Sequence, residues 1–389
     1  MPNLRCVLSE RVRIDSELGR TREQIYARAE DRLAPIRASR QARAERPKRA
    51  LLKGIPAIVA AGDRRAAKAV CGQSKVYLEL GGRALVAHVV AALQAVPEVS
   101  EVWVVGNTER LREVFESEEI KRELRKPFHI VPQFRNLYEN VWQTYRRLLP
   151  GAGPTGRDPG ATEERDLVLY LSADLPFATP QEISQFIQRS VELDCDLACG
   201  LVTEEAMKAF YPVAPGDPGI RMAYFNLCEG RFRVNNLHLV RPARIVNRSY
   251  IEELYEHRYQ KQFGNIIGLA ARLVRKEEGG LRILGYYILI HIAGIANRRG
   301  WRRLADWLRA WISLDRVAEA CSALLRADFR FAVTNIGGCA VDIDNEGDYD
   351  VAKLAFEPWR TAQLERAEQL YGRLPATSAA AAGESERSN

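Results

Sequence analysis

The sequence predicts an α/β fold, a three-layer α/β/α arrangement in which helices cover both sides of a mostly parallel sheet. Apolar runs at 55–61, 101–105 and 166–172 have the length of buried strands, and segments with helical spacing of apolar residues alternate with them. Such alternation favours parallel strands joined by helices. The chain has 389 residues, of which 47% are hydrophobic, enough for a large core.

Charge is unevenly distributed along the chain. Of the net charge of +7, residues 1–50 contribute +6, from 13 Lys and Arg against 7 Asp and Glu, so the rest is nearly neutral. We therefore expect no nucleic-acid partner, and we interpret 1–50 as a charged helical extension without its own core. Seven scattered cysteines predict neither a disulfide framework nor a zinc site. With no apolar signal segment at the start, we expect a cytoplasmic protein.

The first apolar run leads into a basic loop. IPAIVAA ends at Gly62, and the following loop carries Arg64, Arg65, Lys68 and Lys75 before a helical pattern resumes near Leu85. Gly62 permits a sharp turn or the close approach of a ligand. Exposed loop amides together with Lys and Arg can hold a polyphosphate. This stretch therefore predicts a nucleotide site.

The same stretch, AIVAAG followed by SKVYLELGGRALVAHVV, resembles the opening signature of the nucleotidyltransferase superfamily, including MobA-like NTP transferases. The resemblance implies a Rossmann-like, GT-A-like fold. It also implies that Ala60, Ala61 and Gly62 surround the nucleotide and that Lys75 binds phosphate. The second glycine of the family signature is absent and its arginine is displaced, so either Arg64 or Arg65 could take that role. Asn140, in the later helix NLYENVWQTYRRLL, is a further candidate for nucleotide binding.

A second strand delivers an acid to the same predicted edge. DLVLYLS precedes Asp174, and TPQE at 179–182 predicts a capped helix directly behind it. Ligands of open α/β sheets collect at the carboxyl ends of strands. ADLPFATPQEI also resembles the metal-binding segment of MobA-like transferases, which implies that Asp174 coordinates Mg²⁺. The plain alternative is an aspartate that closes a turn.

Two more acids lie near the end of the chain. In VDID, from 341 to 344, Asp342 and Asp344 would point to one face of an extended strand, where they repel each other unless a cation lies between them or water screens them. We expect strand character over 339–344, followed by a helix capped by Asn345. VDIDNEGDYDVAK resembles the terminal acidic segment of MobA-like transferases, which implies that Asp342 or Asp344 completes the metal site.

A hairpin is predicted between these two acidic segments. RMAYFNL and RFRVNNLHLV alternate around a turn at Glu229–Gly230. In the superfamily such an excursion holds the acceptor, so Asn235 and Asn236 become candidate substrate-binding residues. The alternative is that they are polar residues at a strand edge.

Residues 250–327 read as an inserted helical subdomain. The apolar stretch 281–296 is short for a membrane span and contains His291, which we interpret as a core histidine. After it, Trp301, Leu304, Leu308 and Trp311 share a predicted helical face. We expect this face to pack on a neighbouring element, and as a second interpretation we keep contact of 281–314 with the inner membrane surface. The resulting division is 1–50 N-terminal extension, 51–249 first part of the transferase core, 250–327 helical insertion, 328–372 completion of the core, and 373–389 disordered tail.

These observations predict a Mg²⁺-dependent enzyme that transfers a nucleoside monophosphate from an NTP to a phosphorylated small molecule such as a sugar or alditol phosphate. Lys75, Arg65 and Asp174 are the candidate catalytic residues. One alternative is a GT-A glycosyltransferase that uses a nucleotide sugar. The other is a non-catalytic, nucleotide-binding scaffold at a membrane surface.

Overall fold

The computed structural model describes residues 54–63, 69–248 except 213, 215 and 221, residue 251, and 280–375. Outside these residues lie the N-terminal extension, most of the predicted tail, the first part of the predicted helical insertion apart from residue 251, and both Arg64 and Arg65.

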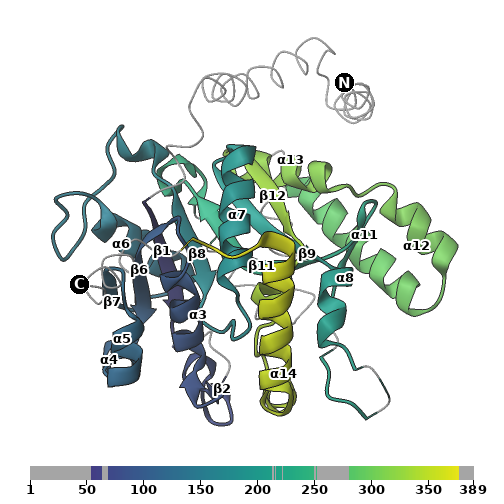
Figure 1. The fold of residues 1–389 in the computed structure, drawn as a ribbon. Helices are drawn as coiled ribbons and strands as arrows, with labels where there is room; N and C mark the ends of the chain where they lie inside the picture. The colour runs from purple at the N-terminus through teal and green to yellow at the C-terminus, as the bar shows by residue number, and fades with distance from the viewer. Residues whose placement is uncertain are drawn as a thin grey trace, which may run out of the picture. The chain divides into compact units, whose positions relative to one another are not determined.

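One eight-stranded sheet organises the fold (Figure 1). Its strand order is β12-β9-β11-β8-β1-β6-β7, with β10 paired to β11. β1 runs parallel to both β6 and β8, and β9 parallel to β12, whereas β11 is antiparallel to its neighbours. The predicted α/β class with a mostly parallel sheet is therefore confirmed. The strands are β1 Ile55–Ala61, β6 Val99–Gly106, β7 Phe128–Pro132, β8 Val168–Ser172, β9 Leu197–Thr203, β10 Phe225–Leu227, β11 Gly230–Val240 and β12 Phe329–Thr334, with small pairs β2 Ala69–Val70 and β3 Gln73–Ser74, and β4 Glu79–Leu80 and β5 Arg83–Ala84.

Helices cover both faces of the sheet. Successive side chains of β1 point to opposite sides, and because they are apolar, both sides pack against helices. Val59 belongs to the apolar cluster that includes helices α3 and α7, whereas Ile58 packs with Tyr145 of α6 on the other face. Figure 1 shows α3, α7 and the C-terminal α14 on one side of the sheet. The helices are α3 Leu85–Gln94, α4 Thr108–Phe115, α5 Glu118–Glu123, α6 Leu137–Leu148, α7 Pro180–Leu193, α8 Glu204–Met207, α11 Gly280–Arg298, α12 Arg302–Arg309, α13 Leu314–Leu325 and α14 Glu346–Tyr371; short 3-10 turns are η2 Lys75–Tyr77, η3 Glu163–Arg165, η4 Lys208–Phe210, η5 Pro242–Arg244 and η6 Gly338–Ala340.

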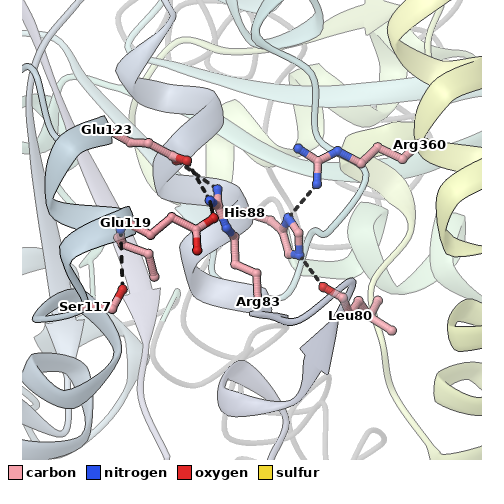
Figure 2. A network of polar contacts seen from close by, with 8 residues as sticks. Leu80, Arg83, His88, Ser117, Glu119, Glu123 and Arg360 are labelled. Atoms are coloured by element: carbon pink, nitrogen blue, oxygen red, sulfur yellow. Dashed lines mark hydrogen bonds and ion pairs between the residues drawn. The ribbon is translucent and has the colours of Figure 1, made fainter.

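A polar network holds α14 against α3 (Figure 2). Burial lowers the pKa of His88 to about 4, so its ring is neutral at neutral pH. The neutral ring donates from Nε2 to the Leu80 carbonyl at 2.9 Å and accepts at Nδ1 from Arg360 of α14 at 3.3 Å. Nearby, Arg83 donates to both carboxylate oxygens of Glu123. These contacts fix the segment that follows Lys75 between two helices.

The predicted starts of two helices, α7 and α14, are confirmed. Thr179 caps α7 by accepting from the Glu182 N–H, Pro180 occupies the first turn, and Asn345 caps α14 by accepting from the Asp348 N–H. The side chain of Glu182, three residues after the cap, does not reach back to the Thr179 N–H as in a capping box, because it is buried and accepts from the N–H of Cys339. A tertiary contact therefore engages the Glu182 side chain, which a capping box would use at the start of the helix.

Two predictions of local structure are wrong. The hairpin turn lies at Cys228–Glu229, because Leu227 pairs with Gly230. Residues 339–344 are not a strand: Cys339 lies in a 3-10 turn and 341–344 form no ladder, although buried Val341 and Ile343 preserve the predicted alternation.

The prediction that Trp301, Leu304, Leu308 and Trp311 pack together on a neighbouring element is also wrong for all but Leu308. Leu308 is buried together with Ala305 and Ile312, whereas Trp301, Leu304 and Trp311 are exposed. The α-helix ends at Arg309, before Trp311. The buried residues Ala305 and Ile312 are not among those that the predicted spacing selected. His291 is exposed and is not a core histidine. Among the described residues, no helix combines the length and apolar content that crossing a bilayer requires.

Candidate active site

The carboxyl ends of β1 and β8 lie side by side at the centre of the sheet. These strands are parallel neighbours, and the Ala173 N–H donates to the Ala60 carbonyl at 3.1 Å. The chain therefore leaves β1 at Gly62 and reaches Asp174 just beyond β8 at the same edge. This edge is where ligands of open α/β sheets bind.

Three carboxylates meet at this edge. Asp174, Asp342 and Asp344 each offer one oxygen, and the three atoms lie within 4.8 Å of one another. Asp174 is almost completely buried and accepts a hydrogen bond from the Ser172 hydroxyl, whereas Asp344 is exposed. The cluster thus has a buried floor and an open side from which a ligand can enter.

The ammonium group of Lys75 lies against the same carboxylates. Its Nζ is 2.5 Å from Asp174 Oδ2 and 2.8 Å from Asp344 Oδ1. Burial by itself would lower the pKa of Lys75, but the carboxylates of Asp174 and Asp344 outweigh it, so the pKa lies above its ordinary value. Lys75 therefore carries its positive charge at physiological pH.

Arg233 of β11 supplies a second cation that the sequence reading did not select. It donates to the Asp342 carboxylate at 2.7 Å and to the Ala340 carbonyl at 2.9 Å. Burial and the carboxylates of Asp174 and Asp344 raise the pKa of Asp342, and Arg233 partly offsets this. In RFRVNNLHLV, Arg233 lies between buried Phe232 and half-buried Val234, and the pattern alone does not show that it faces the acids.

Glu182 of α7 contacts the segment that leads to Asp342. Glu182 is fully buried; its carboxyl group accepts from the Cys339 N–H at 3.0 Å and from the Thr334 hydroxyl at 3.3 Å. A Cβ at Gly338 would lie 2.0 Å from the Phe177 carbonyl oxygen, so only glycine allows this close approach. Glu182 and Gly338 therefore determine where the second acidic segment leaves the core.

A group of hydrogen-bonded polar side chains lies beside Gly62. The Gln133 side chain accepts from the Asp63 N–H at 3.0 Å and donates to the Asp63 carboxylate at 2.6 Å. Asn140 of α6 accepts from the Phe134 N–H at 2.6 Å, and a Cβ at Gly62 would lie 3.2 Å from its amide nitrogen. The structure thus brings the predicted residues Gly62 and Asn140 together, and it adds Gln133, which the sequence reading missed.

The two alanines of the signature have a different role from Gly62. Ala60 and Ala61 are buried at the end of β1, where their side chains belong to the core and only backbone atoms are available to a ligand. Arg64 and Arg65 lie outside the described residues. Which of them approaches a phosphate therefore stays a prediction.

Asn235 and Asn236 differ from each other in position. Asn235 is fully buried; its amide donates to the Thr334 hydroxyl at 3.1 Å and its carbonyl accepts from the Leu237 N–H. Asn236 has a φ of 58° where the pairing of β11 with β9 changes register. None of these contacts joins either asparagine to Asp174, Asp342 or Asp344, so their role in acceptor binding stays a prediction.

The cluster suits a hard divalent cation. Three carboxylates face two neighbouring cations, Lys75 and Arg233, which leaves a net negative charge among close oxygen atoms. Carboxylate oxygens are the ligands that Mg²⁺ prefers. Asp174, Asp342 and Asp344 are thus the described residues that could hold such an ion.

Comparison with known proteins gives a family match over the first part of the chain. The model of the MobA-like NTP transferase domain matches residues 57–272, more than half of the chain. The 2-C-methyl-D-erythritol 4-phosphate cytidylyltransferase of Chlorobium luteolum is 26% identical over 141 residues, which cover 36% of this chain and 56% of that enzyme. The matched region therefore spans little more than half the length of this relative.

Similar solved structures include a hypothetical transferase from Thermus thermophilus and the 4-diphosphocytidyl-2C-methyl-D-erythritol synthase of Anaerococcus prevotii. The first has a TM-score of 0.49 and 21% identity, covering 76% of this chain and 99% of the other. The second has a TM-score of 0.36 and 11% identity, covering 78% of this chain and 99% of the other.

Proposed function

The chain belongs to the MobA-like NTP transferase domain family, and on that premise we propose that it is a Mg²⁺-dependent nucleotidyltransferase. The reaction transfers a nucleoside monophosphate from an NTP to a phosphorylated small molecule and releases pyrophosphate. The observation that carries the proposal is the meeting of Lys75 with Asp174 and Asp344 beside the glycine turn that ends β1.

The chemistry requires positioning and charge neutralisation more than covalent participation by the protein. A phosphate oxygen of the acceptor attacks the α-phosphorus of the NTP, the bond to the bridging oxygen breaks, and pyrophosphate leaves with that oxygen. Negative charge develops on the phosphate oxygens and on the leaving group, and preorganised cations stabilise it. Lys75 is one such cation, and Arg64 or Arg65 in the neighbouring loop is proposed as another.

The metal has a defined place in this proposal. Asp174 with Asp342 or Asp344 would hold Mg²⁺, which when bound neutralises phosphate charge and favours one alignment of the two substrates. Arg233 would keep the Asp342 carboxylate oriented through their 2.7 Å contact. The fully buried Glu182 would keep the segment in place.

The remaining predicted residues define the two substrate positions. Gly62 and Asn140, with backbone atoms of Ala60 and Ala61, would surround the nucleotide, and Gln133 would hold the loop through Asp63. Asn235 and Asn236 would contribute to the acceptor side, Asn236 more directly because Asn235 is buried. The name of the Chlorobium relative specifies a cytidylyl group and the phosphate of a sugar alcohol, which supports an alditol phosphate as the acceptor class.

The test is an activity screen on the full chain. The protein is incubated with each NTP, Mg²⁺ and a panel of sugar and alditol phosphates, and pyrophosphate release is measured. Release is expected with one NTP and one acceptor, and it should fall strongly in Lys75→Ala. Lys353→Ala, on the α14 surface, is the matched control and should retain activity.

Other outcomes would identify the alternatives. Transfer of a sugar from a nucleotide sugar without pyrophosphate would indicate a GT-A glycosyltransferase. Nucleotide binding without turnover against the whole panel would favour a non-catalytic nucleotide-binding scaffold. Full activity of Lys75→Ala would contradict the proposed phosphate contact.

A further inference from the structure

Exposed apolar side chains lie on α11, on α12 and in the turns before and after α12. We refer to them as the Trp–Ile patch, which consists of Ile288, Ile292, Ile295, Trp301, Trp307 and Trp311. Trp307 is 60% exposed and Trp301 is 52% exposed, which is unusual for the largest apolar side chain. Exposed apolar patches that exceed the usual scatter of single residues mark interaction sites.

Helical spacing and ring contacts join neighbouring members of the patch. Ile288, Ile292 and Ile295 are spaced by four and three residues, so they form one stripe on α11. Arg299 extends this stripe, and its guanidinium lies 5.4 Å from the centre of the Trp301 ring. The rings of Trp307 and Trp311 are in edge contact, with centroids 6.3 Å apart.

The exposure of the patch is not a sign that the helices are detached from the core. Ala305, Leu308 and Ile312 lie close by in sequence and are buried. Ile312 packs with Leu227 and Phe232 of the β10–β11 hairpin, and its carbonyl accepts from the Cys228 N–H at 2.9 Å. Thus α12 uses one part of its apolar surface as an anchor and leaves the tryptophans outside.

Positive charge borders the patch. Residues 280–316 contain seven arginines and two aspartates, without lysine or glutamate. Arg299, Arg302 and Arg303 are exposed, whereas Asp306 is paired with Arg309. The surface therefore combines tryptophan and isoleucine with an excess of guanidinium groups.

The apolar side chains and the arginines of this surface both match groups of an anionic lipid surface. Tryptophan rings partition to the level of the lipid headgroups, isoleucine side chains can enter the acyl boundary, and arginines pair with lipid phosphates. A nucleic acid would be attracted by the arginines but would leave the isoleucine stripe unmatched. A second copy of the same patch would bring arginine-rich borders against each other.

We propose that the Trp–Ile patch docks on the surface of an anionic phospholipid bilayer. Because no described helix is suited to span a membrane, the contact is peripheral. The proposal concerns a surface formed by α11 and α12 and stands independently of the transferase reaction.

The test is vesicle flotation with the full chain. Wild-type protein is expected to float with vesicles of phosphatidylcholine mixed with phosphatidylglycerol and to float much less with phosphatidylcholine alone. A Trp307→Glu/Trp311→Glu variant should lose at least about tenfold in binding, because it removes two interfacial rings and adds two like charges to those of the lipid. The matched control is Leu354→Glu/Leu364→Glu, which adds the same charge at two exposed leucines of α14 and should bind as wild type.

Three results would overturn the proposal: no flotation of the wild type, equal flotation with neutral vesicles, or retained binding in the tryptophan variant. Retained binding would place the contact elsewhere, for example in the basic N-terminal extension. Thermal unfolding and sedimentation of each variant control for folding and for self-association. If the tryptophan variant is unfolded, Arg302→Glu/Arg303→Glu provides the same comparison, because both side chains are exposed.

Discussion

The acid cluster at the sheet edge and the Trp–Ile patch on the helical block are built in opposite ways. The cluster joins residues distant in sequence, such as Lys75 and Asp344, which are 269 positions apart and lie 2.8 Å from each other. The patch comes from one short segment, and its stripe on α11 follows from helical spacing alone.

The acid cluster and the Trp–Ile patch should therefore respond differently to substitution. In the cluster each side chain has charged neighbours at close range, so removing one leaves another unpaired in a partly buried place. In the patch the side chains face outward, so removing one alters the surface with little effect on folding.

The largest effect is expected for Asp174→Asn. This change removes one charge from the cluster without altering side-chain size, and the pyrophosphate release rate should fall by on the order of 10³-fold. Asp350→Asn, an exposed acid on α14, is the control and should be nearly neutral. Activity of Asp174→Asn within a few fold of wild type would show that the buried acid is not a metal ligand.

A smaller loss is expected for Arg233→Met. Arg233 touches a carboxylate of the cluster and would act through it, so turnover should fall about 10- to 100-fold, and more Mg²⁺ should be needed for half-maximal rate. Arg330→Met, which breaks a pair with Asp328 on β12, is the matched control. An unchanged Mg²⁺ requirement in Arg233→Met would mean that the arginine has only a structural role.

The third prediction concerns stability and pH at Glu182. Burial raises the pKa of Glu182 to about 8, so the folded protein keeps a proton that the unfolded chain releases above about pH 4.5. The free energy of unfolding should therefore decrease as the pH rises from about 4.5 to about 8, by up to about 1.4 kcal/mol per pH unit from this group.

Glu182→Gln isolates this contribution. The amide can still accept from the Cys339 N–H and does not ionise, so the pH dependence of the unfolding free energy should become flatter in the same interval. Denaturant unfolding of both proteins at pH 5 and pH 8 measures the difference. If the unfolding free energy changed equally between pH 5 and pH 8 in the two proteins, Glu182 would not retain a proton in the folded state.

Local chemistry made much of the fold predictable. The apolar runs gave β1 and β8 because a buried strand needs little more than consecutive apolar residues, and Thr179 and Asn345 marked helix starts because a cap acts within three residues. The alternation around Asp342 and Asp344 placed both acids on one side even though 341–344 form no strand. In each case neighbours in sequence are sufficient to determine the outcome.

Which side chains meet depends on the packing of distant elements and could not be predicted. Arg233 faces Asp342, Asn235 is buried against Thr334, and Glu182 leaves its helix cap to hold Cys339. The same is true of α12, where packing buries Leu308 and leaves Trp307 outside. Sequence periodicity specifies the faces of a helix or strand, but the partner of each face depends on how elements far apart in the chain pack together.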